Sequence, residues 1–356
     1  MPITAEDFRR AFDFRLREFW DEIGGRFPVE SPAESVFLDL TEFVQRPGKR
    51  LRPWLFVEFY RHFSGDRDWN TVGIMRGAIA LELLHAFILA HDDIVDRAED
   101  RRGLASLQNV LSRHFGKHKE NSRHGQNLAL IGGDILFALA YEALLRSGFP
   151  PEKFVEALRY FSSAAIETGI GEVMEIYVSS KEIESVKLEF VEEIYNLKTT
   201  RYTLIMPMRL AGIVSGAESN EMEMIESALT SLGLAFQMQN DLEDFWRLER
   251  RYSATDLTEG RKTLLLCMAY EALNEVDRTL LQLCLSDAEH HESSIMRIVA
   301  LIKKSGAVPR MRNRQVELLR LGVIKLRERD NLQRLFLEIA ERMGLNALLT
   351  DKHSSI

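Results

Sequence analysis

Residues 78–96 read AIALELLHAFILAHDDIVD, an apolar run that ends in a cluster of three aspartates. The run contains neither glycine nor proline, and it therefore predicts one long helix that is largely buried. Asp92 and Asp96 are four residues apart and would share one face of this helix. Neighbouring carboxylates repel one another unless a cation binds them, and their oxygens are suitable ligands for Mg²⁺. The stretch predicts a metal site at the end of a buried helix, and a solvated acidic helix end is the alternative.

Helical spacing of apolar residues continues along most of the chain. No alternating run of useful length predicts a strand, and no linker or repeat divides the sequence. We therefore expect one all-α domain over residues 1–356, with ten or more helices. The expected helices cover residues 5–20, 33–45, 50–63, 70–96, 127–146, 152–178, 187–214, 219–248, 262–286, 292–304 and 311–343.

Composition limits the class of protein. The chain has 356 residues, of which 46% are hydrophobic, and its formal net charge is −8. An anionic chain with scattered basic residues argues against a nucleic-acid partner. Cys267 and Cys284 lack a metal-binding spacing and indicate a reducing compartment, the cytoplasm. We expect no signal peptide and no membrane span, because no apolar run of spanning length is evident.

A second acidic cluster lies far downstream, in the segment FQMQNDLED at residues 236–244. Gln237, Asp241 and Asp244 follow the spacing i, i+4 and i+7, so they would line one helical face. A surface stripe is the alternative. Two acidic clusters on separate helices would be able to face one another across a central cavity, with Mg²⁺ ions and a diphosphate between them.

Basic residues accompany both acidic clusters. Lys49 and Arg52 are three residues apart at a predicted loop-to-helix junction, where backbone N–H groups would also attract an anion. An arginine pair follows the first aspartates and would be able to grip a phosphate. Each basic residue alone is typical of a protein surface, but together they match the charge that two diphosphate substrates require. The remaining basic positions are Arg101, Arg102, Lys198, Arg261 and Lys262.

The motifs also follow a specific order along the chain. They are GKRLRP (48–53), ELLHAFILAHDDIVD with RRG (82–103), GGD (132–134), KTTRYT (198–203), FQMQNDLED (236–244) and EGRKT (259–263). This order resembles that of the trans-isoprenyl diphosphate synthases, the polyprenyl synthetase family, which includes farnesyl and geranylgeranyl diphosphate synthases. The resemblance covers roughly residues 33–330 and implies the isoprenoid synthase fold, a helical bundle around a central cavity.

The resemblance implies a role for each motif position. About three Mg²⁺ ions would be held by Asp92, Asp93, Asp96, Asn240, Asp241 and Asp244. The allylic diphosphate would contact Arg101. The diphosphate of isopentenyl diphosphate would be bound by Lys49, Arg52, His85 and Arg102. The departing diphosphate would be stabilised by Lys198, Lys262 and Arg261, and the reacting centre would be lined by Thr199 and Gln237.

The implied reaction is a head-to-tail condensation by a homodimer. Diphosphate leaves the allylic substrate, the double bond of isopentenyl diphosphate attacks the allylic carbocation, and the released diphosphate takes a proton. The cavity must be apolar because water would quench the cation. Phe87 lies five residues before Asp92, with Ile88 beside it. By resemblance, an aromatic ring there limits the product to fifteen or twenty carbons, whereas simple packing of Phe87 between helices is the alternative.

The sequence departs from the family pattern in the second acidic motif and at two glutamates, and two functions other than chain elongation remain as alternatives. Asn240 stands where the family usually has Asp, and an amide oxygen would bind the third metal less tightly. Glu172 and Glu175 stand where the family often has Gln and Asp. A class I terpene cyclase often starts its second motif with Asn-Asp, and a non-catalytic regulatory subunit would have lost metal ligands. The retained second set of basic residues argues for two substrates, and hence for elongation.

Overall fold

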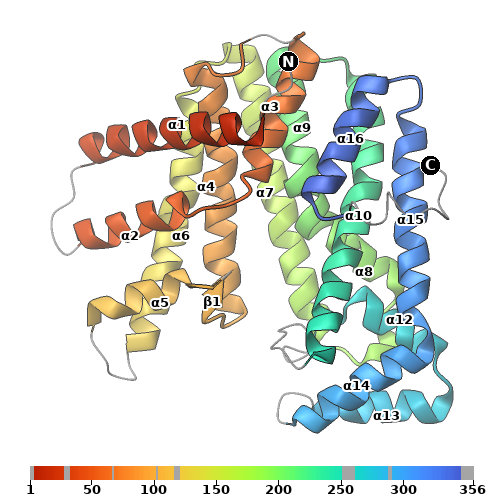
Figure 1. Cartoon of the computed structure of the whole chain (residues 1–356). Coiled ribbons are helices and arrows are strands. Elements are labelled where there is room, and N and C mark those ends of the chain that lie inside the picture. The colour runs from red at the N-terminus through yellow and green to blue at the C-terminus, as the bar shows by residue number, and fades with distance from the viewer. Residues whose placement is uncertain are drawn as a thin grey trace. The chain divides into compact units, whose positions relative to one another are not determined.

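The computed structural model describes residues 4–27, 33–65, 68–101, 103–115, 121–250, 261–287 and 291–345 (Figure 1). Within these ranges helices dominate, and the prediction of an all-α fold is confirmed. The chain folds into two compact units. Unit 1 comprises Met1–Tyr160 and Pro207–Ala217, and unit 2 comprises Phe161–Met206 and Glu218–Ile356. The expectation of one domain over the whole chain stays a prediction.

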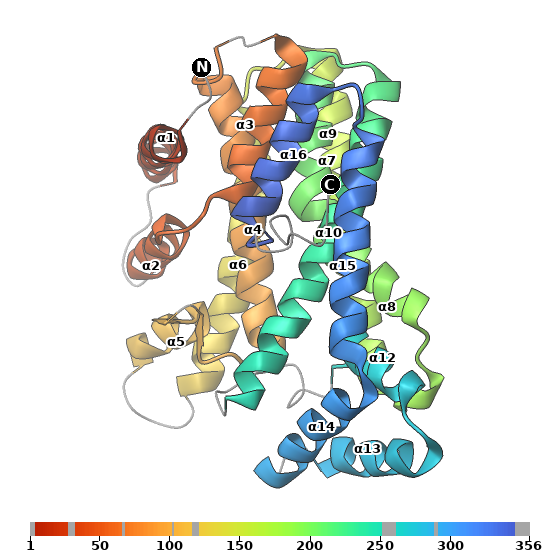
Figure 2. The same cartoon turned by 45° about the vertical axis from the view of Figure 1, so that its right-hand side comes forward.

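Unit 1 is built around two long helices, α4 (Val72–Val95) and α6 (Asn121–Leu145), which lie side by side in both views (Figure 1, Figure 2). The side chain of Thr71 caps α4 by accepting a hydrogen bond from the backbone N–H of Ile74. The other elements of unit 1 are α1 (Ala5–Arg26), α2 (Ala33–Gln45), α3 (Leu51–Ser64), α5 (Leu107–Ser112), η1 (Arg113–Phe115), the start of α7 (Pro151–Ser179) and most of α9 (Met206–Ser215).

Two helices of unit 1 correct the statement that no apolar run reaches spanning length. By length and composition alone, α4 and residues Ser122–Leu145 of α6 would be able to cross a membrane. This is weak evidence for a span, because the core helix of a folded unit has the same composition, and 56% of the apolar window of α4 is buried.

A buried ion pair ties α3 to α4. Arg50 precedes α3 in a left-handed backbone conformation (φ 49°), and its guanidinium donates to Glu82 in the middle of α4. The same guanidinium donates to the carbonyl oxygens of Val44 and Arg46, each at 3.0 Å. The ring of Phe12 lies 5.7 Å from the guanidinium carbon. Arg50 is only 6% exposed and Glu82 only 8%, so each charge depends on its partners.

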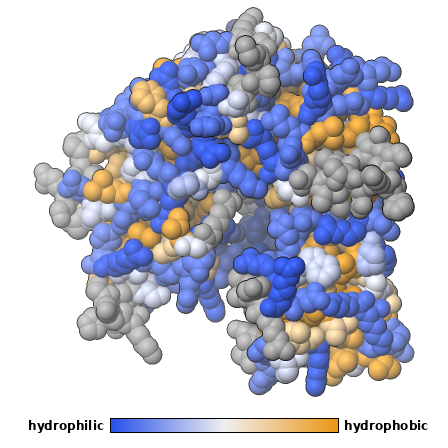
Figure 3. All heavy atoms as spheres, in the orientation of Figure 1, coloured by the Kyte–Doolittle hydropathy of each residue, from blue (hydrophilic) through white to orange (hydrophobic). Residues whose placement is uncertain are grey.

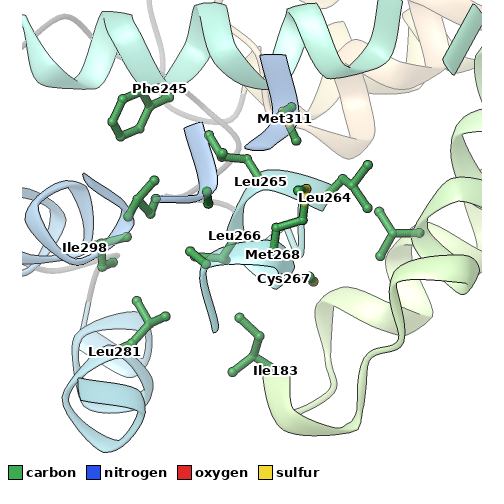
Figure 4. Close-up of a cluster of buried hydrophobic side chains, with 14 of the residues drawn as sticks. Ile183, Phe245, Leu264, Leu265, Leu266, Cys267, Met268, Leu281, Ile298 and Met311 are labelled. Atoms are coloured by element: carbon green, nitrogen blue, oxygen red, sulfur yellow. The ribbon is translucent and has the colours of Figure 1, made fainter. Parts of the chain in front are cut away.

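Unit 2 is organised around α12 (Leu264–Ala272), whose residues 264–269 are all apolar and sit inside a cluster of buried side chains (Figure 4). Phe245, Leu281, Ile298 and Met311 reach this cluster from four other helices. The elements of unit 2 are the main part of α7, η2 (Ile183–Ser185), α8 (Leu188–Tyr195), η3 (Asn196–Ile205), α10 (Ser219–Glu249), α12, α13 (Glu275–Asp287), α14 (Glu292–Ser305), α15 (Ala307–Lys325) and α16 (Asp330–Arg342). Hydrophilic residues cover most of the face drawn in Figure 3, with smaller apolar areas between them.

The expected helices omit α5 and η1, and they differ from the observed ones at three interruptions. The segment 187–214 contains the π-helix η3 between α8 and α9, and the segment 262–286 breaks between α12 and α13. The segment 311–343 breaks before α16, where Glu328 adopts a φ of 70°. A short hairpin was not predicted. Its strands, β1 (Asp100–Arg101) and β2 (Leu104–Ala105), pair antiparallel with Arg101 opposite Leu104.

Loss of the buried carboxylate at position 82 should strongly destabilise the protein. Glu82→Ala removes the carboxylate to which the buried Arg50 guanidinium is hydrogen-bonded and leaves Asp13, 3.4 Å from Arg50 Nε, as a remaining charge partner. The free energy of unfolding should therefore fall by about 3 kcal/mol, the lower end for a broken buried ion pair. Urea unfolding measures this change. Glu42→Ala is the matched control, because Glu42 pairs with Arg46 at the surface, where such pairs contribute about 0–1 kcal/mol. Equal losses in the two variants would contradict a special role for the buried pair.

Candidate active site

The first aspartate cluster closes the C-terminal end of α4. Asp93 is fully buried, while Asp92 and the C-terminal cap residue Asp96 are partly exposed. Arg101 donates from Nε to Asp93 Oδ1 and from Nη2 to Asp92 Oδ2, each at 2.8 Å. The β1–β2 hairpin holds Arg101 in this position. One guanidinium therefore bridges two neighbouring carboxylates and offsets part of their negative charge.

Two further contacts shape this end of α4. The buried Gln108 side chain donates to the carbonyl oxygens of Asp93 (3.0 Å) and Ala98 (2.9 Å), which fixes the turn after the helix. Burial raises the pKa of Asp93 above its ordinary value, and the Arg101 guanidinium opposes that rise. The turn and the arginine together hold an acidic cluster that repulsion alone would disperse.

The predicted chain-length residue Phe87 packs between α4 and α6. Its ring lies edge-on to the His91 ring at 4.6 Å and 4.9 Å from the Phe137 ring. His91 in turn lies 3.1 Å from the carbonyl oxygen of Leu130. A Cβ at Gly133 would come within 2.4 Å of the His91 ring, so the GGD motif allows α6 to approach α4 here. A role of Phe87 and Ile88 in product length stays a prediction.

The remaining predicted residues of unit 1 lie on α3, on α4 and before α3. Lys49 is exposed in the segment that leads into α3, and Arg52 is partly buried in its first turn. His85 is partly buried on α4, which packs against α3. Arg50, between the two basic residues, was not predicted, although a lone Glu82 within an apolar run was a signal that a buried cation faces it. Arg102 lies outside the described residues.

In the second cluster, Asp241 is buried, and its carboxylate is held by hydrogen bonds. Both of its carboxylate oxygens accept the hydroxyl of Tyr195, at 2.7 and 2.8 Å, and Oδ2 also accepts the backbone N–H of Leu265 at 3.2 Å. The Tyr195 oxygen accepts the backbone N–H of Leu264 at 3.0 Å. Asp241 thus anchors the N-terminal end of α12, where the helix dipole favours negative charge. Sequence reasoning missed Tyr195, which pairs with a residue 46 positions away.

A cavity of about 220 Å³ lies beside this anchor, within unit 2. It gathers the predicted residues of the second acidic motif and of the EGRKT motif. They are Gln237, Asn240, Asp241, Asp244, Arg261 and Lys262, together with Glu175 and Tyr195. The side-chain amide of Asn240 donates to Gln237 Oε1. The amide oxygen of Asn240 is therefore the part of this side chain that would be able to bind a cation.

Ion pairs lie beside this cavity and reach it through Glu175, although Lys198 and Glu172 are not among its lining residues. The ammonium of Lys198 lies 2.7 Å from Glu172 and also pairs with Glu175, while Arg261 lies 3.8 Å from Glu175. Lys262 donates to the carbonyl oxygen of Ser179 at 3.3 Å. Burial lowers the pKa of Lys262 from its ordinary value. A bound polyanion would favour the charged form of this lysine and offset the effect of burial.

The carboxylates do not form a closed metal site by themselves. Within the described ranges, no three His, Cys, Asp or Glu side chains are grouped closely enough to hold a metal ion. Mg²⁺ commonly binds one or two carboxylates and completes its shell with substrate phosphate oxygens and water. The donors present suit such a shared site. The expectation that the two acidic clusters face one another concerns both units and stays a prediction.

Known proteins similar to this chain are prenyl diphosphate synthases. The geranylgeranyl diphosphate synthase of Sulfolobus acidocaldarius is 27% identical over 262 residues, covering 72% of this chain and 73% of that protein. The geranylfarnesyl diphosphate synthase of Natronomonas pharaonis is 25% identical over 341 residues, covering 91% and 93%. A geranylgeranyl pyrophosphate synthase from Corynebacterium glutamicum, crystallised with isoprenyl diphosphate and magnesium, has the same fold, with a TM-score of 0.85, 21% identity and coverage of 96% and 99%.

The match to the family extends over most of the chain. The sequence model of the family described as polyprenyl synthetase matches residues 36–302. The predictions of an enzyme and of a short-chain prenyltransferase are confirmed, and the cyclase and regulatory-subunit alternatives are not favoured. This chain therefore belongs to the polyprenyl synthetase family, as the order of its motifs indicated.

Proposed function

We propose that the protein condenses an allylic diphosphate with isopentenyl diphosphate and releases a prenyl diphosphate of fifteen or twenty carbons. The observation that carries the proposal is the cavity of unit 2, where basic residues lie beside Asp241, Asp244, Asn240 and Gln237. A diphosphate needs both cationic side chains and metal-binding oxygens, and this cavity offers both. Relatives named as geranylgeranyl and short chain isoprenyl diphosphate synthases support a short-chain product.

Metal binding in this proposal divides between the two acidic motifs. Asp92 and Asp96 on α4 would hold Mg²⁺ with Asp93 beside them, and Asp244, Asn240 and Asp241 on α10 would hold a third ion, directly or through water. When bound, Mg²⁺ neutralises charge that builds up on a departing diphosphate. Arg101 already contacts two of the carboxylates, so a diphosphate arriving there would share its guanidinium.

The side chains of unit 2 would act on the departing group. Lys198, Lys262 and Arg261 would stabilise the charge of the diphosphate as its bond to the allylic carbon breaks. Glu172 and Glu175 hold the Lys198 ammonium in place before the substrate arrives. Thr199 and Gln237 would line the reacting carbons. Lys49, Arg52 and His85 of unit 1, together with Arg102, would hold isopentenyl diphosphate, whose double bond attacks the cation.

The α7 helix carries a surface that suits a second copy of the chain. Ile166, Ile170, Val173 and Tyr177 are between 48% and 67% exposed and follow the spacing 4, 3, 4, so they form one apolar stripe. Such a stripe is typical of a helix that packs against another helix. We propose that it packs in a homodimer. The two cysteines are buried thiols without a disulfide, which suits the proposed cytoplasmic location.

An assay with both substrates tests the reaction. Purified protein with Mg²⁺, an allylic diphosphate and isopentenyl diphosphate should give a prenyl diphosphate only when both substrates are present. Lys198→Gln should lower kcat by about a hundredfold because the departing diphosphate loses a cation. The exposed Lys181→Gln is the control and should change little. Hydrocarbon from the allylic substrate alone would indicate a cyclase, and no turnover without a partner would indicate a regulatory subunit.

Restoring a carboxylate at position 240 should strengthen metal binding. Asn240→Asp should lower the Mg²⁺ concentration needed for half-maximal rate by about threefold to tenfold, because a charged oxygen binds Mg²⁺ better than an amide. Titration of the initial rate with Mg²⁺ measures this shift. Gln239→Glu adds the same charge one residue away and outside the cavity lining. An unchanged titration, or the same shift in both variants, would show that position 240 is not near the metal.

A charge on the α7 stripe should separate the proposed dimer. Val173→Glu places a carboxylate in the middle of the stripe and should weaken self-association by about tenfold or more, because a buried, unpaired charge is costly. Sedimentation equilibrium measures the molecular mass. Val276→Glu on α13 is the control, because Val276 is 79% exposed and lies outside the stripe. A wild-type chain that sediments as a monomer would contradict the proposal.

A further inference from the structure

The segment that carries Lys198 and Thr199 is not an ordinary α-helix. Residues Asn196–Ile205 form the π-helix η3 between α8 and α9, and its pattern extends to the backbone N–H of Met206, which bonds to the carbonyl oxygen of Arg201. A π-helix has a wider turn than an α-helix, is rare, and occurs frequently at functional sites. The helices packed against it must therefore leave more room than usual.

Two glycines on neighbouring helices provide this room. A Cβ at Gly171 of α7 would lie 2.7 Å from the backbone nitrogen of Lys198 and 3.0 Å from Cβ of Leu197. A Cβ at Gly233 of α10 would lie 2.3 Å from Oγ1 of Thr200 and 2.4 Å from its Cγ2. These distances are too short for a real Cβ atom, so neither position accepts a side chain unless η3 moves.

Both glycines lie next to groups of the cavity. Gly171 directly precedes Glu172 and is four residues before Glu175, the two carboxylates that hold the Lys198 ammonium. The backbone of Lys198 thus lies against α7 at the same turn where its side chain is bound. Gly233 is four residues, about one turn, before Gln237, which lines the cavity.

The close contact with η3 is confined to particular glycines, as a comparison with Gly169 shows. Gly169 lies two residues before Gly171 on α7, yet a Cβ there would meet nothing within 4 Å. Glycine lowers the stability of a helix interior relative to alanine. Glycine at positions 171 and 233 thus costs helix stability, and these are two positions where a side chain would displace η3.

We infer that Gly171 and Gly233 are positioning residues, which seat the π-helix closely between α7 and α10 and thereby set the place of Lys198 and Thr199. The inference rests on the proposed function, because that function assigns Lys198 to the departing diphosphate and Thr199 to the reacting centre. A displacement of η3 by a few tenths of an ångström or more would move the Lys198 ammonium away from the site where charge develops. Such misplacement lowers kcat more than substrate binding.

Alanine substitutions test the inference in the full-length protein. Gly171→Ala should lower kcat by about tenfold or more, with the KM for isopentenyl diphosphate changed by less than about threefold. Gly169→Ala should leave both constants within about twofold of wild type, because the methyl group meets open space. Equal kcat values in these two variants would overturn the inference.

A paired substitution adds a rescue. Gly233→Ala should also lower kcat by about tenfold, and adding Thr200→Gly should restore at least about threefold, because it removes the Oγ1, Cγ2 and Cβ atoms that the new methyl group meets at 2.3, 2.4 and 2.7 Å. Thr200→Gly alone gives the reference for this comparison. If Gly171→Ala does not fold, this rescue decides the question. A double variant no better than Gly233→Ala would overturn the role of Gly233.

Hydrogen exchange gives a measurement that does not depend on turnover. Peptides covering residues 196–205 should exchange faster in Gly171→Ala and Gly233→Ala than in Gly169→Ala, because a displaced π-helix loses backbone hydrogen bonds. Unchanged exchange would overturn the packing argument. If wild-type protein forms no product from the two substrates, the proposed function fails, whereas the exchange comparison still shows whether the two glycines seat η3.

Discussion

Repulsion between neighbouring carboxylates is the constraint on which the arrangement of this protein depends. Five of the carboxylates in the candidate site are each held by a cation or a hydroxyl within their own unit. Arg101 joins Asp92 and Asp93 at the end of α4, and Tyr195 holds Asp241 on α10. Lys198 lies between Glu172 and Glu175. The partners allow carboxylates to gather in partly buried places, where unpaired charges would be too costly.

In the second acidic motif, the residues that stabilise the fold differ from those that would bind a cation. Asp241 is engaged by Tyr195 and by the backbone of α12, so its carboxylate stabilises the helix that fills the core of unit 2. A cation in the adjacent cavity would then depend chiefly on Asp244 and on the amide oxygen of Asn240. In the proposed function, the missing charge at position 240 would therefore have a larger effect than the loss of one carboxylate in three.

Hydrophobic periodicity predicted the all-α class. The second acidic motif and the EGRKT motif line one cavity of unit 2, whereas Lys198 and Thr199, predicted for the same site, are not among its lining residues. The π-helix was beyond such reasoning, because apolar spacing over residues 187–214 does not distinguish a wide turn from an ordinary one. Its geometry depends on space left by Gly171 and Gly233, which no local pattern encodes. Tyr195 and Arg50 were missed for a related reason, since each pairs with a residue far away in the sequence.

The pairing of Lys198 has a consequence for catalysis. Two carboxylates on α7 hold the Lys198 ammonium in one place before a substrate arrives. As a diphosphate leaves and gains charge, it would compete for an ammonium that is already positioned, so little reorganisation remains to be done. The close packing of η3 against α7 and α10 also fixes the position of Lys198. A cation stabilises the departing group most strongly when it is already held close to the developing charge.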